Sequence, residues 1–243
     1  MKNLKGVFAL LIAALSLTSC GGKTITREQA LETAKAIQTE VAKVDANTVS
    51  FDAAMEISTK EKDQKEEHNN VYLKLDMEHY IIYSKIDLTT NKTDGTQETM
   101  LNEGYIWVNE TKLMVQATNN GKVEKQEVDM ETSEAAIATF KSTIKPMKDI
   151  LDPVEFTKMY IDGMVNLIGK PAEEGSVETF HSKGAGHLRI DVEEKQEGLN
   201  ASGYYEFENN MFVALHADVE LDGSTVKQRL DISYGVPTIK LPK

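Results

Sequence analysis

The alternation of apolar and polar residues predicts a helix near the start of the chain, followed by a series of strands. In residues 26–45 the apolar positions recur at spacings of three and four, which places them on one face of a helix. Thr26 and Gln29 have the spacing of a capping box, so the helix is expected to begin there. Residues 48–128 then show the two-residue period of half-buried strands, and Asn119–Gly121 is typical of a hairpin turn.

The middle of the chain is expected to be helical. Ser133 is a candidate N-cap for one helix, and residues 153–168 form a second. The polar side chains of this second helix share one narrow stripe, and apolar side chains fill the rest of its surface. A helix that is apolar over most of its circumference is deeply buried or contacts something other than water.

Strands resume after these helices, and their longest alternation covers residues 211–221. The order of elements contains no alternation of single strands with single helices, so a parallel, doubly wound sheet is not expected. We predict an α+β fold with one long curled antiparallel sheet and an N-terminal helix. The central helices are expected to cover the concave face that a strongly twisted sheet leaves.

The first twenty residues have the pattern of an exported lipoprotein. Lys2 and Lys5 precede the uncharged apolar run 6–17, and small residues then lead to Cys20. These features are typical of a secretory signal, and the run is too short to cross a hydrocarbon core of ~30 Å. The segment Leu17-Thr18-Ser19-Cys20 resembles the lipobox that lipoprotein signal peptidase cuts, which implies diacylglycerol on the Cys20 sulfur and a new N-terminus there.

We therefore expect a signal peptide at residues 1–19, the lipidated cysteine with a short tether at 20–25, and a single domain over 26–243. The alternatives for Cys20 are an incidental free thiol after an ordinary signal peptide, or an uncleaved anchor helix, which the short apolar run disfavours. Because the chain has one cysteine, it forms no internal disulfide, and the fold depends on its core.

The net charge of the chain limits the classes of partner that it can bind. The formal net charge is −12, and removal of Lys2 and Lys5 with the signal peptide makes it −14. Such a surface repels nucleic acid and anionic headgroups, so no nucleic-acid partner is expected. Attachment is instead expected through the acyl chains, at the extracytoplasmic face of a cell membrane, because two chains give stable anchoring.

The sequence contains no recognisable catalytic or cofactor motif. No two histidines have helical metal-ligand spacing, and the Gly-x-Ser-x-Gly elbow of serine hydrolases is absent. The paired carboxylates are typical of solvated loops and strand ends in an acidic chain. We therefore expect no metal, no cofactor and no enzymatic activity.

The closing segment Asp231-Ile232-Ser233-Tyr234-Gly235-Val236-Pro237, together with the order of elements, resembles the LolA/LolB-like carriers and the mycobacterial LppX/LprG lipoproteins. In LppX-type domains a final strand similarly runs into a Tyr-Gly-x-Pro segment and a short extended tail. The resemblance covers most of the mature chain in architecture, but only this ending in residues. It implies a half-open β-barrel with helices over its mouth, holding an acyl chain or a whole lipid.

The leading hypothesis is a membrane-anchored extracytoplasmic lipoprotein that binds or carries a hydrophobic ligand between sheet and helices. The ten methionines fit either ordinary packing or a pliable ligand lining. The predicted lining consists of Val71, Leu73, Leu75, Met77, Phe156, Tyr160 and Met164. The first alternative is a non-enzymatic binding or scaffolding lipoprotein with a solid core and a protein partner, and an exported enzyme ranks last. The identity of the ligand, the protein partner, the choice between inner and outer membrane, and the oligomeric state remain open.

Overall fold

The computed structural model describes residues 22–61, 66–92, 94–172 and 174–242. These residues form an α+β fold with three α-helices and twelve strands of one antiparallel sheet, which confirms the predicted class and strand direction. The chain divides into two compact units. Unit 1 takes the described residues within 1–44, 58–64 and 153–231, and unit 2 takes those within 45–57, 65–152 and 232–243. The prediction of a single domain over 26–243 stays a prediction.

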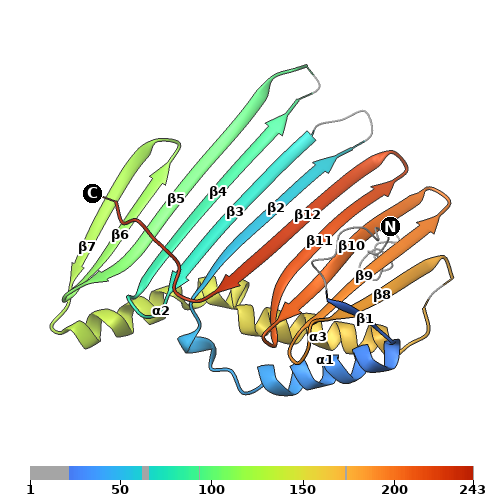
Figure 1. The fold of residues 1–243 in the computed structure, drawn as a ribbon. Helices are drawn as coiled ribbons and strands as arrows, with labels where there is room; N and C mark the ends of the chain where they lie inside the picture. The colour runs from blue at the N-terminus through green and yellow to red at the C-terminus, as the bar shows by residue number, and fades with distance from the viewer. Residues whose placement is uncertain (1–21, 62–65, 93, 173, 243) are drawn as a thin grey trace. The chain divides into compact units, whose positions relative to one another are not determined.

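Unit 1 combines antiparallel strands from the start and the second half of the chain with two helices. In sheet order its strands are β1 (Lys23–Ile25), β8 (Ser176–Ser182), β9 (Leu188–Gln196), β10 (Leu199–Glu208), β11 (Met211–Leu221) and most of β12 (Ser224–Tyr234). Helices α1 (Arg27–Val41) and α3 (Pro153–Ile168) pack side by side (Figure 1), and α3 also contacts β11. The two helices therefore contribute to the core of this unit.

Helix α1 begins at a capping box. The Thr26 hydroxyl accepts a hydrogen bond from the Gln29 backbone N–H at 3.3 Å, and the Gln29 side chain accepts one from the Thr26 N–H at 3.0 Å. These two bonds satisfy donors that the first helical turn leaves without partners. The buried residues of the helix, which follow the expected spacing, are Ala30, Ala34, Ile37 and Val41.

Strand β1 differs from the tether expected at residues 20–25. Lys23–Ile25 pair antiparallel with Phe180–Ser182 of β8. An edge strand offers unpaired backbone groups, and a three-residue partner has too little alternation to be recognised in the sequence. Cys20 and the predicted signal peptide 1–19 lie outside the described residues, so both predictions stay predictions.

Unit 2 contains a run of antiparallel strands in sequence order with one helix. Its strands are most of β2 (Phe51–Lys60), β3 (Glu66–Asp76), β4 (Ile81–Asn91), β5 (Gln97–Asn109), β6 (Lys112–Asn119) and β7 (Lys122–Asp129). Helix α2 (Ser133–Leu151) packs against β5 and β6. Its N-cap is Thr132 rather than the expected Ser133, because the Thr132 hydroxyl accepts a hydrogen bond from the Ala135 N–H at 3.1 Å.

The strand register of unit 2 explains its core. Leu75 pairs with Ile82, and Ile82 pairs in turn with Ile106, so apolar side chains from three strands share one face of the sheet. Leu75 and Ile82 are buried. The predicted hairpin turn between β6 and β7 is confirmed, since Asn120 and Gly121 both have positive φ, as a tight two-residue turn requires.

Two glycines of unit 1 lead to opposite predictions for the same substitution. A Cβ on Gly203 in β10 would lie 2.3 Å from the backbone oxygen of His216, so Gly203→Ala is expected to lower the free energy of unfolding by about 1–3 kcal/mol. A Cβ on the exposed Gly163 of α3 meets nothing within 4 Å, so Gly163→Ala is expected to raise it by roughly 0.5–1 kcal/mol. Urea unfolding followed by circular dichroism measures both, and equal effects would contradict the crowding at Gly203.

Candidate functional site

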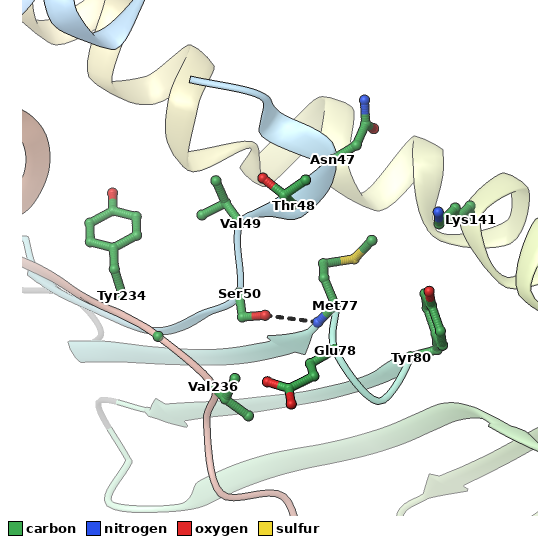
Figure 2. A pocket seen from close by; sticks show the side chains of 11 residues that line it. Asn47, Thr48, Val49, Ser50, Met77, Glu78, Tyr80, Lys141, Tyr234 and Val236 are labelled. Atoms are coloured by element: carbon green, nitrogen blue, oxygen red, sulfur yellow. Dashed lines mark hydrogen bonds between the residues drawn. The ribbon is translucent and has the colours of Figure 1, made fainter. Parts of the chain in front are cut away.

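The candidate site is a pocket within unit 2, with a volume of about 480 Å³ (Figure 2). Four parts of the chain line it: residues 47–50 just before β2, the turn residues Met77, Glu78 and Tyr80 between β3 and β4, Lys141 of α2, and residues 234–236 at the end of β12 and beyond. Pockets that hold small ligands commonly measure about 300–1,000 Å³. The volume is therefore adequate for a small ligand or for part of a larger one.

A buried carboxylate shapes the turn that leads into the pocket. Asp76, the last residue of β3, is buried, and its Oδ1 accepts hydrogen bonds from the backbone N–H groups of Glu78 and His79, both at 2.9 Å. Its other oxygen lies 2.8 Å from His79 Nδ1. The hydrogen bond that His79 donates to Asp76, together with the charge of this carboxylate, raises the pKa of His79. Aspartate favours such turns because its side chain bonds the backbone two residues later.

Tyr80 has a backbone conformation that is uncommon for residues other than glycine. Its φ is 56°, in the left-handed region. Its carbonyl accepts a hydrogen bond from the Val108 N–H at 3.2 Å, and its ring meets that of Phe140 edge to face, with centroids 6.0 Å apart. Lys141 Nζ lies 5.6 Å from the same ring centroid. Contacts with both the sheet and α2 therefore hold Tyr80 at the pocket despite its backbone strain.

Ser50 joins two walls of the pocket. Its hydroxyl oxygen accepts a hydrogen bond from the Met77 N–H at 2.8 Å (Figure 2), and its carbonyl accepts one from the Gly235 N–H at 3.0 Å. Gly235 has a φ of +119°, which suits glycine better than any other residue. These two bonds hold the turn and the segment after β12 on either side of Ser50.

The lining combines apolar and polar side chains in about equal number. Its apolar part comes from Val49, Met77 and Val236, with the rings of Tyr80 and Tyr234. Its polar part comes from Asn47, Thr48, Ser50, Glu78 and Lys141. Such a lining suits a ligand that has both an apolar part and a polar end, because a few polar groups orient what the apolar surface binds.

The described residues provide neither a metal-ligand cluster nor a membrane-spanning helix. Within residues 22–61, 66–92, 94–172 and 174–242, no group of three or more histidine, cysteine, aspartate or glutamate residues is placed to hold a metal ion. In the same parts of the chain, no helix has the length and apolar character needed to cross a membrane.

The structure distributes the predicted ligand-lining residues over both units. Met77 lines the pocket, whereas Leu73 and Leu75 are buried in β3 and Val71 is half-buried in the same strand. The remaining three, all on α3 of unit 1, are Phe156, Tyr160 and Met164. A shared ligand lining for all seven stays a prediction.

Two of the three predicted residues on α3, Phe156 and Tyr160, belong to an aromatic cluster in unit 1, and Met164 is buried in the same helix. Tyr160 stacks on Phe212 of β11 with ring centroids 4.4 Å apart and an interplanar angle of 16°. The ring centroids of Phe156 and Tyr205 lie 6.1 Å and 5.9 Å from that of Tyr160. Burial raises the pKa of Tyr160 and raises that of Tyr205 to about 12. Ring-to-ring packing on β10 and β11 therefore covers part of the apolar surface of α3, and α1 packs against the same helix.

Several residues that matter to these arrangements were not anticipated. Ser50, Tyr80 and Lys141 come from the segment before β2, a turn and a helix, and nothing in their sequence spacing joins them. Thr157 was likewise missed: it is fully buried in α3, its hydroxyl donates to the Pro153 carbonyl at 2.7 Å, and it accepts from the Phe212 N–H at 2.9 Å. A hydroxyl residue within an apolar helix face is the signal that would have found it.

Comparison with known proteins leaves the chain without an assigned family. No protein-family model matches the sequence, and no curated protein matches it. The resemblance to the LolA/LolB-like and LppX/LprG lipoproteins therefore rests on the predicted architecture and on the closing segment 231–237 alone.

Proposed function

We propose that this protein is a membrane-anchored extracytoplasmic lipoprotein, without enzymatic activity, that binds or carries a hydrophobic ligand such as a lipid or an acyl chain. The observation that supports the proposal is the pocket of about 480 Å³ in unit 2, whose lining includes Met77 and four other apolar or aromatic side chains beside five polar ones. Methionine suits variable hydrophobic ligands because its flexible side chain adapts its shape.

The anchor in this proposal is diacylglycerol on Cys20, with the protein at the outer face of a cell membrane. The apolar run before Cys20 and the small residues beside it support this part. The proposal also includes a curled, half-open β-barrel whose helices cover the concave face. The packing of α3 on β11 in unit 1, and of α2 on β5 and β6 in unit 2, supports that arrangement.

A second function has one specific observation in its favour. The stacked rings of Tyr160 and Phe212 fill the contact between α3 and β11 in unit 1. A filled core of this kind is what a scaffolding lipoprotein with a protein partner would have. The two proposals differ in whether a hydrophobic molecule occupies the pocket of unit 2.

Native mass spectrometry of the whole mature chain carrying Cys20→Ala, with organic extraction of bound material, tests the proposal. We expect a stoichiometric lipid or fatty acid to leave with the protein. Val236 lines the pocket and is 50 % exposed, so Val236→Asn is expected to reduce ligand binding about threefold to tenfold without unfolding the chain, because it replaces apolar lining.

Leu241→Asn is the matched control, since Leu241 is 41 % exposed in the same segment and lies outside the lining. This variant should bind as the parent chain does. A protein without bound ligand, whose mass stays unchanged after incubation with membrane lipids, would exclude the lipid-binding proposal and favour the scaffolding one.

A further inference from the structure

We infer that the ligand of this pocket has an acidic headgroup, a carboxylate or a phosphate, which lies at Lys141 while the apolar chain runs along Met77. The inference rests on the proposed function, because it names the chemical class of ligand for the same pocket. It follows from the charges and hydrogen-bond donors of the lining.

Lys141 is a cation without a carboxylate partner among the described residues. Two other lysines pair with a glutamate three residues earlier: Lys158 of α3 with Glu155, and Lys43, just after α1, with Glu40, both at 2.6 Å. Lys141 has apolar residues three and four positions before it, and no carboxylate three or four positions after it. Helical neighbours at these spacings are the ones that form ion pairs, so α2 itself leaves the charge of Lys141 uncompensated.

An aromatic ring positions this cation at the pocket. Lys141 Nζ lies over the Tyr80 ring, 5.6 Å from its centroid, and a cation–π contact of this kind is weakly attractive. The Tyr80 ring also packs against Phe140, the residue before Lys141 on α2. The ammonium group is therefore held beside the lining, where an acidic group of a ligand can reach it.

The charged side chains of the lining favour one orientation of an acidic ligand in the pocket. Figure 2 shows Lys141 and Glu78 on opposite sides of Met77, and both side chains belong to the lining. Lys141 attracts an acidic headgroup and Glu78 repels it, so the headgroup is expected at the α2 side with the chain extending past Met77. Opposite charges at two ends of a site fix the orientation of a charged ligand more strongly than they raise its affinity.

The remaining polar groups of the lining favour a ligand whose headgroup accepts hydrogen bonds. The Ser50 oxygen already accepts a hydrogen bond from the Met77 N–H, which leaves its own hydroxyl hydrogen to be donated. The Asn47 amide donates one N–H to Asp45 Oδ1 at 3.1 Å and keeps a second one, whereas the Thr48 hydroxyl already donates to the Asp45 carbonyl at 2.9 Å. A cation together with these two remaining donors matches a carboxylate or a phosphate, because hydrogen bonds to ionised acceptors are stronger than those to neutral ones.

Isothermal titration calorimetry tests this inference with decanoate, decyl phosphate and decanol, which share one chain length. The protein is the whole mature chain carrying Cys20→Ala. We expect both acids to bind about fivefold more tightly than decanol, as an exposed ion pair allows, with a preference that weakens at high salt. Lys141→Gln should abolish the preference, and Glu78→Gln should strengthen acid binding.

Lys145→Gln is the matched control, because Lys145 lies one turn further along α2, is exposed and is not part of the lining. Its acid preference should equal that of the parent chain. Equal affinities for decanol and both acids, or equal weakening of all three by Lys141→Gln, would overturn the inference and leave the proposed function standing. Absence of binding by all three probes would overturn both. Circular dichroism of each variant establishes that it is folded.

Discussion

Phe212→Ala is expected to lower the free energy of unfolding by about 3–5 kcal/mol, the usual cost of truncating a fully buried phenylalanine. Phe212 is completely buried in β11, and its ring stacks on Tyr160 and meets Phe207 edge to face at 5.6 Å. The loss combines the transfer free energy of the ring with the cavity left between β11 and α3. Urea unfolding followed by far-ultraviolet circular dichroism measures the change.

Phe156→Ala is the matched control for this prediction. Phe156 belongs to the same aromatic cluster, but it is half-buried and its ring centroid lies 6.1 Å from that of Tyr160. We expect Phe156→Ala to lower the free energy of unfolding by less, about 1–2 kcal/mol, because part of the Phe156 ring is already in contact with water. Equal losses for the two variants would show that the stacking on Phe212 is not the main stabilising contact of this cluster.

Cys20→Ala is expected to move nearly all of the protein from the membrane fraction to the soluble fraction, or to leave it unprocessed. The proposed acyl chains stabilise membrane attachment by about 0.8 kcal/mol per buried methylene, and two chains are enough for stable anchoring. The chain has a net charge of −12, so anionic headgroups repel it overall and do not replace the acyl chains. Labelling with radioactive palmitate, followed by membrane fractionation, measures both the modification and the location.

Ser19→Ala is the control for the anchor, because it keeps a small residue directly before Cys20. This variant should be labelled and retained in the membrane as the parent chain is. Palmitate incorporation by Cys20→Ala at the level of the parent chain would rule out Cys20 as the site of lipid attachment.

Local chemistry explains which parts of the fold could be predicted from the sequence. The Thr26–Gln29 capping box and the turn at Asn120 and Gly121 depend on residues only a few positions apart, and the structure contains both. Antiparallel pairing followed from the two-residue alternation of apolar side chains, which sets the buried face of each strand. Strand β1 was missed because its pairing depends on β8, far away in the sequence.

The candidate site was predicted only in part, because its residues have no common pattern. Met77 was included since it continues the apolar alternation of Leu73 and Leu75. Tyr80 and Lys141 were not, because one depends on a left-handed turn conformation and the other on the position of α2 against the sheet of unit 2. Such long-range contacts form through tertiary packing, which local propensity does not specify.

The division of unit 2 into separate chain segments affects when the pocket can form during biosynthesis. Its helix and most of its strands are complete by residue 152, whereas Tyr234–Val236, which form one wall of the pocket, come after all of β8–β11. Ribosomes and secretion channels deliver a polypeptide from its N-terminus, and contacts between residues so far apart in sequence form slowly. The nascent chain therefore cannot use ligand binding at this pocket to guide its early folding, and a binding-competent pocket first exists after synthesis has passed residue 236.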